Sequence, residues 1–108
     1  MKGKIVLIPF PFTDLSSTKL RPALVLYESK HDVVALFISS RTENPKPTDI
    51  IIDKKHPEFK QTGLKVTSAL RIDKIATISK ELILGEIGEV GSKLKTEINR
   101  KITELYIL

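Results

Sequence analysis

Short runs of strand-forming residues, separated by segments rich in turn-forming residues, cover most of this sequence. The runs are dense in Val, Ile, Leu and Phe and lie at residues 4–12, 22–27, 32–40, 49–53, 64–70 and 71–78. Such runs, with polar or proline-containing segments between them, are typical of antiparallel hairpins. The pattern therefore predicts a mainly β chain whose strands are joined by exposed loops, which include residues 13–19, 41–48 and 54–63.

The last third of the chain departs from this pattern. Ser79 can cap one helical turn at residues 79–82, and two glycines favour a bent or bulged strand over residues 83–90. Ser92 is then a suitable N-cap for a helix. The apolar residues of this helix recur at helical spacing, at Leu94, Ile98, Ile102, Leu105 and Tyr106. Short strands closed by one amphipathic helix predict a small curved barrel or a sandwich.

Length and composition define the class of protein. A chain of 108 residues, with 41% hydrophobic and 29% charged residues, is expected to form one globular domain over residues 1–108. There is no cysteine, so disulfides and thiolate metal sites are excluded and the cytoplasm is the expected compartment. The first apolar run is short and broken by prolines, so we expect neither a secretory signal nor a membrane span. The formal net charge of +5 favours polyanionic partners, although many proteins this basic bind no nucleic acid.

Metal catalysis has little support in the sequence. His31 and His56 are the only histidines, and Asp49 and Asp53 flank a strand without further oxygen ligands nearby. The two histidines could instead form an acid–base pair, because imidazole titrates near neutral pH. Both lie in polar, turn-like segments, so surface histidines are the favoured interpretation. We expect no metal and no cofactor.

Arginine and hydroxyl side chains stand at the ends of two strands. Arg21 lies where the first loop meets the run at 22–27, and Ser39, Ser40 and Arg41 lie where the run at 32–40 ends. If the two strands are neighbours, a guanidinium and one or two hydroxyls converge at the rim of the sheet, and this combination suits a phosphate group. An arginine that lies along the sheet edge and serines that merely end a strand are the alternative, which spacing alone favours.

The resemblance to a known family changes that balance. Residues 3–14 (GKIVLIPFPFTD) and 19–26 (KLRPALVL) resemble the opening of the MazF/PemK family of toxin endoribonucleases, with an apolar strand, a short polar loop and an Arg-Pro-x-Leu-Val strand. Later segments fit as well, at residues 37–40, 62–64, 68–71 and 74–78. The resemblance covers nearly the whole chain.

The family implies an SH3-like antiparallel β barrel with a C-terminal α helix. It also implies a homodimer that cleaves single-stranded RNA at short preferred sequences and is neutralised by a partner antitoxin. The family's catalytic arginine falls on Arg21, and its catalytic threonine falls on Ser39, with Ser40 as the alternative alignment. The short loop before Arg21 lacks the insertion of some relatives and fits the subgroup with Pro-Phe-Thr-Asp, so the RNA sequence preference does not transfer.

The implied reaction is attack of the RNA 2′-hydroxyl on the adjacent phosphate, which needs no metal. Arg21 suits stabilisation of the charge that develops on the phosphate, and it is a poor base because guanidinium stays protonated. Ser39 would hold the reacting groups in line, and Ser17, Ser40 and Arg41 are candidates for positioning the RNA. The rival hypothesis is a non-catalytic SH3-like module that binds RNA or protein, for which a hydroxyl beside Arg21 has no required role.

Overall fold

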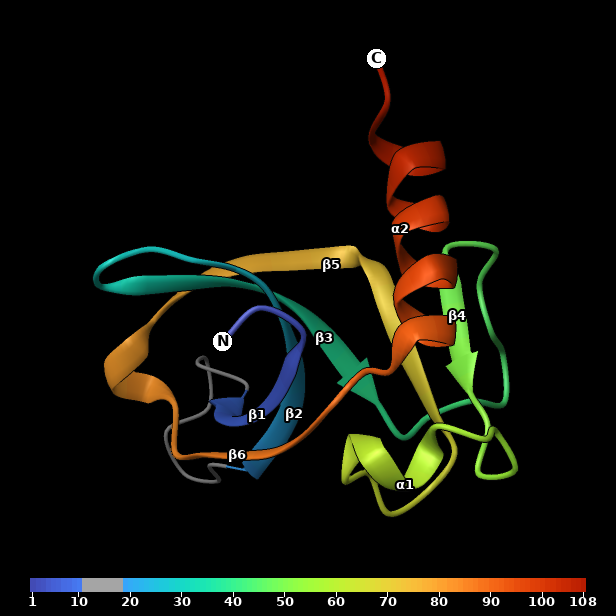
Figure 1. Cartoon of the computed structure of the whole chain (residues 1–108), viewed down its shortest axis with the longest axis horizontal. Coiled ribbons are helices and arrows are strands. Elements are labelled where there is room, and N and C mark those ends of the chain that lie inside the picture. Colours follow the sequence, from blue (N-terminus) through green and yellow to red (C-terminus); the bar gives the residue numbers. More distant parts are fainter. Residues whose placement is uncertain (11–18) are drawn as a thin grey trace.

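The computed structural model describes residues 1–10 and 19–108 and shows a strongly curled sheet with a long helix standing beside it (Figure 1). Its strands are β1 (Lys4–Phe10), β2 (Lys19–Glu28), β3 (Asp32–Ser39), β4 (Asp49–Ile52), β5 (Ser68–Ser79) and β6 (Gly85–Glu89). Its helical segments are α1 (Phe59–Thr62), the 3-10 turn η1 (Lys80–Leu82) and α2 (Ser92–Tyr106). The single helical turn after Ser79 and the long C-terminal helix are both as the sequence predicts.

The strands form one antiparallel sheet in the order β4-β5-β3-β2-β1-β6. Strands that are consecutive in the sequence pair from β1 to β3, as short connections favour, whereas β6 returns to pair with β1. The curled antiparallel sheet with its C-terminal helix confirms the predicted mainly β fold of the SH3-like barrel type.

Side chains alternate between the two faces of the sheet and build two separate cores. On β2, Leu24 belongs to the core that α2 covers, together with Leu94 and Ile98 from the helix. The neighbouring residues Ala23 and Val25 belong to the second core. The two faces of one strand therefore serve different surfaces of the molecule.

The two short strands predicted at 64–70 and 71–78 are one bent strand, β5, which begins only at Ser68. The bend follows from a shift in pairing, because Leu36 pairs with Ile75 whereas Ile38 pairs with Leu70. Residues 71–74 of β5 therefore lie opposite Phe37 alone. This is a large bulge, and bulges turn a strand and redirect its side chains.

The segment at 54–63, predicted to be a loop, contains the helical turn α1, which packs against β6. Gly63 ends this turn with a φ of 74°, and a Cβ at this position would lie 2.0 Å from the carbonyl oxygen of Ile87. Only glycine combines the left-handed backbone with this close approach. The turn was missed because its residues carry no apolar period long enough to indicate a helix.

The N-cap of α2 is Gly91, and not Ser92 as predicted. The carboxylate of Glu58, which precedes α1, accepts hydrogen bonds from the backbone N–H groups of Lys93 and Leu94, each at 2.9 Å. These bonds, led by the one from Leu94, lower the pKa of the Glu58 carboxyl. A charged acceptor from a distant segment replaces the local hydroxyl, because an anion at a helix N-terminus is also favoured by the helix dipole. Among the described residues, no helix is both long and apolar enough to cross a membrane.

Candidate active site

The pairing of β2 with its neighbours brings Arg21 and Ser39 to the same end of the sheet. Arg21 pairs with Ile8 of β1, and Ala23 pairs with Phe37 of β3. Continuing the second register by two residues would set Arg21 opposite Ser39. The two side chains therefore extend the face that carries the second core, at the rim where that core ends. The sequence-based convergence of this arginine and this hydroxyl agrees with the observed arrangement.

The bend in β5 adds two more cations to this place. Arg21, Phe37, Ile38, Ser39, Arg41, Arg71 and Lys74 together line a cavity of about 360 Å³, which we call the basic cavity. Arg71 and Lys74 come from the bulged residues opposite Phe37. Sequence reasoning missed both as functional residues, although both lie in segments that fit the family pattern. The missing signal was the bulge, which no periodicity indicates.

Most of these positive charges lack a partner. Arg71 pairs with Asp49, whereas Arg21, Arg41 and Lys74 form no ion pair with any described residue. The Nε of Arg21 is buried and has no hydrogen-bond partner among the described residues. A buried donor without a partner is costly, so it calls for an acceptor that residues 1–10 and 19–108 do not supply. A phosphate oxygen is such an acceptor, and it also neutralises the excess charge.

Asp49 begins a chain of hydrogen bonds that ends on Ser39. Its carboxylate is fully buried and accepts from Nη1 of Arg71. Nη2 of Arg71 donates to the backbone carbonyl of Arg41 at 2.9 Å, and the backbone N–H of Arg41 donates to Oγ of Ser39 at 3.1 Å. Because Oγ of Ser39 already accepts this bond, its own O–H is left to donate into the cavity. We call this series the Asp49 chain.

The remaining predicted site residues are distributed around the basic cavity. Arg41 lines it, and Ser40 lines an adjoining cavity that also touches Arg21. Ser17 lies outside the described residues. His31 sits in the turn between β2 and β3, and the ring of His56 accepts the backbone N–H of Glu58 near α1. Neither histidine lines the basic cavity.

No three His, Cys, Asp or Glu residues within the described ranges 1–10 and 19–108 lie close enough together to hold a metal ion. The lining of the basic cavity contains no carboxylate and no imidazole among the described residues. What the cavity offers a substrate is therefore positive charge and hydrogen-bond donors, and these suit an anion.

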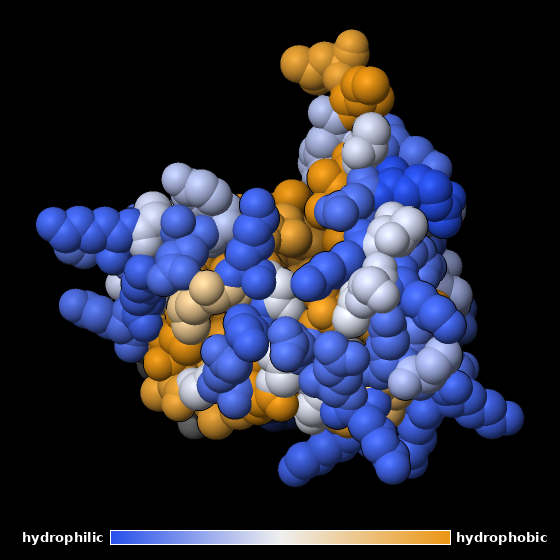
Figure 2. Space-filling model, viewed as in Figure 1, coloured by the Kyte–Doolittle hydropathy of each residue, from blue (hydrophilic) through white to orange (hydrophobic). Residues whose placement is uncertain are grey.

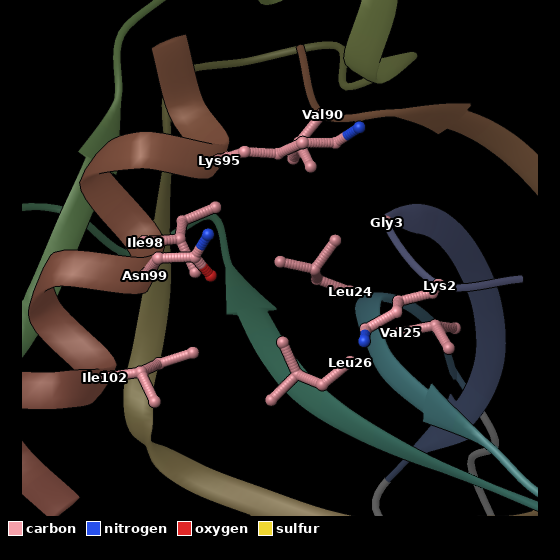
Figure 3. A pocket seen from close by; sticks show the side chains of 10 residues that line it. All are labelled: Lys2, Gly3, Leu24, Val25, Leu26, Val90, Lys95, Ile98, Asn99 and Ile102. Atoms are coloured by element: carbon pink, nitrogen blue, oxygen red, sulfur yellow. The ribbon is translucent and has the colours of Figure 1, made fainter. Parts of the chain in front are cut away.

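A second, larger cavity lies on the opposite side of β2. It measures about 460 Å³ and is bounded by β2, by α2 and by residues 2 and 3, and we call it the helix groove (Figure 3). Its apolar lining includes Leu24, Leu26, Ile98 and Ile102, and Lys95 borders it. Figure 2 shows apolar side chains between α2 and the sheet, and again at the C-terminal end of the chain.

Comparison with protein families and known structures finds relatives of this chain. Residues 1–106 match the family described as PemK-like, MazF-like toxin of type II toxin-antitoxin system. A search of curated protein sequences finds no match.

Several solved structures share the fold at low sequence identity. A MazE–MazF complex from Deinococcus radiodurans aligns with a TM-score of 0.73 and 18% identity, over 96% of this chain and 92% of that one. An endoribonuclease in complex with its cognate antitoxin from a mycobacterial species aligns with a TM-score of 0.69 and 21% identity, over 96% of this chain and 91% of that one. The Mycobacterium tuberculosis toxin MazF-mt6 aligns with a TM-score of 0.70 and 19% identity, over 94% of this chain and 93% of that one.

Proposed function

The chain belongs to the PemK-like, MazF-like toxins of type II toxin–antitoxin systems, and from this membership and the basic cavity we propose that it is an endoribonuclease that cleaves single-stranded RNA. The observation that carries the proposal is the cavity itself. There the Nε of Arg21, the hydroxyl donor of Ser39 and the cations of Arg41 and Lys74 meet, and none of these groups is paired with another described residue. RNA supplies the phosphate oxygens that these groups lack. A site for a neutral ligand would gain nothing from so much uncompensated charge.

The proposed reaction is a transesterification within the RNA chain. The 2′-oxygen forms a bond to the adjacent phosphorus, the bond to the 5′-oxygen of the next nucleotide breaks, and a cyclic phosphate and a 5′-hydroxyl result. The 2′-proton leaves to solvent and the departing 5′-oxygen takes up a proton. Arg21 stabilises the negative charge that builds up on the phosphate oxygens, because a planar guanidinium group matches this geometry with two donors. Arg71, whose Nη1 and Nη2 already donate to Asp49 and to the carbonyl of Arg41, holds the lining of the cavity in place.

Ser39 is assigned the role of orienting the scissile phosphate. Its hydroxyl is held by the N–H of Arg41, so its proton is directed into the cavity and can donate to a non-bridging oxygen. A phosphate fixed in this way keeps the attacking and leaving oxygens in line, which is worth a large part of the rate of such a reaction. Arg41 and Lys74 then contact flanking phosphates and set the register of the strand.

The binding partners and the cellular compartment that we propose rest on the same family membership. We propose that the 108-residue chain is one domain, acts in the cytoplasm as a homodimer, and is neutralised by a cognate antitoxin. The proposal of an antitoxin partner is supported by MazE–MazF complexes of the same fold. The net charge of +5 favours an acidic antitoxin segment, which would compete with RNA for the basic cavity and bind more slowly at high salt.

The test is cleavage of a mixed-sequence RNA by the purified protein in excess chelator, with both new ends mapped. We expect 2′,3′-cyclic phosphate and 5′-hydroxyl ends without added metal. An Arg21→Ala preparation purified in parallel controls for contaminating ribonuclease. If chelator abolishes cleavage and magnesium restores it, the proposed chemistry is wrong. If RNA binds tightly but stays intact, the protein is a binding module, and the fold is then used without catalysis.

A further inference from the structure

Lys74 differs chemically from the other cations that line the basic cavity. Arg21, Arg41 and Arg71 carry guanidinium groups, which stay protonated in proteins. A lysine ammonium group is also charged at neutral pH, but it can release a proton and take one back. Ser39 is an alcohol, as is the protonated leaving group of the proposed reaction, so a proton passed between the two gains nothing. Among the described lining residues, Lys74 is therefore the one best suited to transfer a proton.

The side chain of Lys74 is available to a substrate. Lys74 lies in the bulged part of β5, is exposed, and forms no ion pair or hydrogen bond with any described residue. Its neighbour Asp73 is turned elsewhere, since the Asp73 carboxylate lies 3.7 Å from Nζ of Lys46 and does not line the basic cavity. No described carboxylate therefore pairs with the Lys74 ammonium, which faces the cavity with all of its protons.

Lys74 and Arg21 reach the basic cavity from opposite sides of β3. The sheet order β5-β3-β2 places β3 between their two strands, and Ser39 is the last residue of β3. A phosphate held by Arg21 and Ser39 therefore has Lys74 on its β5 side. The attacking and leaving oxygens of the proposed reaction lie on opposite sides of the phosphorus atom, so a group that approaches from one side acts on one of them.

We propose that Lys74 is the general acid of the cleavage reaction and protonates the leaving 5′-oxygen, a role that rests on the proposed function. As the bond between phosphorus and the 5′-oxygen breaks, Nζ transfers one proton to that oxygen, which gives a neutral amine and a 5′-hydroxyl. Solvent then returns a proton to the amine. An ammonium group has protons to give and no lone pair to accept the 2′-proton, so it serves the leaving group. Its other two N–H groups remain for a flanking phosphate.

The first test separates the charge of Lys74 from its proton. Lys74→Arg keeps the positive charge in a group that does not release its proton, whereas Lys74→Met removes both. We expect single-turnover cleavage to fall about 100-fold in each variant, the lower end of the range for a general acid. Lys60→Met removes an equal charge from an exposed position of α1 and should cut RNA like the wild type. Because Lys74 is exposed, its variants should melt at the wild-type temperature.

The second test makes the proton unnecessary. In an RNA with one mapped cleavage position, the 5′-oxygen at the cut is replaced by sulfur. A thiol is far more acidic than an alcohol, so the sulfur departs as a thiolate without taking up a proton. Lys74→Arg and Lys74→Met should therefore cleave this RNA as fast as the wild type. Arg21→Ala should be slow on both RNAs, because negative charge builds up on the non-bridging oxygens in either case.

The outcomes separate the proposed acid from the proposed function. If Lys74→Arg cuts ordinary RNA at the wild-type rate, or if Lys74→Met is equally slow on both RNAs, Lys74 supplies only charge and the inference is overturned while the nuclease stands. If sulfur restores cleavage to Asp73→Asn and not to the Lys74 variants, the proton comes from Asp73 and the inference is again overturned. A wild type that cuts no RNA at all would overturn the proposed function and the inference with it.

Discussion

The basic cavity and the helix groove lie on opposite faces of the same strand and differ in nearly every property. Arg21 points to the face of β2 that carries the second core, and Leu24 and Leu26 point to the face that α2 covers. The basic cavity is lined by Arg21, Arg41 and Lys74, which form no ion pair with any described residue, together with Phe37 and Ile38. The helix groove is aliphatic and depends on where α2 stands. Because successive side chains of β2 point to opposite faces, one strand contributes to both surfaces. Mutations on one surface should therefore not change the effect of mutations on the other.

The largest effect should come from Arg21→Lys, which removes the forked donors of the basic cavity and keeps the charge. We expect single-turnover cleavage to fall about 100-fold to 1000-fold, the range for a lost transition-state donor. The melting temperature should hardly change, since the Nε of Arg21 has no hydrogen-bond partner in the described part of the chain. Arg100→Lys on the exposed side of α2 is the matched control. A fully active Arg21→Lys variant would remove Arg21 from the chemistry.

Ser39→Ala deletes the hydroxyl that the N–H of Arg41 orients. We expect a loss of about tenfold to a thousandfold in single-turnover rate, because one positioned donor is removed. Ser39→Thr keeps the hydroxyl and stiffens the side chain, so the rate should be equal or higher. Ser40 lines the adjoining cavity, so Ser40→Ala should change the rate less. If Ser40→Ala is the more damaging change, the alignment with the family threonine is wrong by one residue.

Asp49→Asn tests whether the Asp49 chain positions the basic cavity from outside it. The amide cannot match the charge-assisted bond to Arg71, so the carbonyl of Arg41 and the hydroxyl of Ser39 should lose their fixed positions. We expect a loss of about tenfold in the cleavage rate, as is typical when a residue that orients the groups in contact with the substrate is changed. Asp53→Asn at the exposed end of β4 is the control.

A double-mutant cycle shows whether the effect passes through Arg71. In an Arg71→Gln background, Asp49→Asn should cost almost nothing more in cleavage rate, because the link it supports is already broken. Full additivity of the two losses would mean that Asp49 does not act on cleavage through Arg71.

The sequence predicted what depends on pattern and missed what depends on the sheet's irregularities. The runs of strand-forming residues predicted most of the strands, and the resemblance placed Arg21 and Ser39, whose convergence follows from an ordinary antiparallel register. Arg71 and Lys74 were not recognised because a bulge in β5, and no periodicity, turns them toward the cavity. The cap of α2 was missed for a similar reason, since Glu58 is distant in the sequence and only the fold brings it to the helix.

The smallest effect on cleavage should come from Glu58→Gln, which weakens the N-terminus of α2 beside the helix groove. The Glu58 carboxylate holds the first turn of α2, so its neutral analogue should lower the melting temperature at neutral pH. The hydrogen bonds lower the pKa of Glu58 in the folded state, so the stabilisation is present above its ordinary value of 4.5 and is lost as the pH falls through the lowered pKa. The difference in melting temperature between wild type and Glu58→Gln should therefore shrink on acidification from pH 7.

Cleavage at neutral pH, measured well below the melting temperature of both proteins, should be equal in wild type and Glu58→Gln, because no residue of α2 lines the basic cavity. Glu97→Gln, on the same helix but outside its first turn, should show neither the loss of stability nor its pH dependence. A Glu58→Gln variant that melts like the wild type yet cuts RNA more slowly would contradict the independence of the two surfaces. It would mean that the position of α2 is transmitted through β2 to Arg21, and that the two faces of the strand act as one unit.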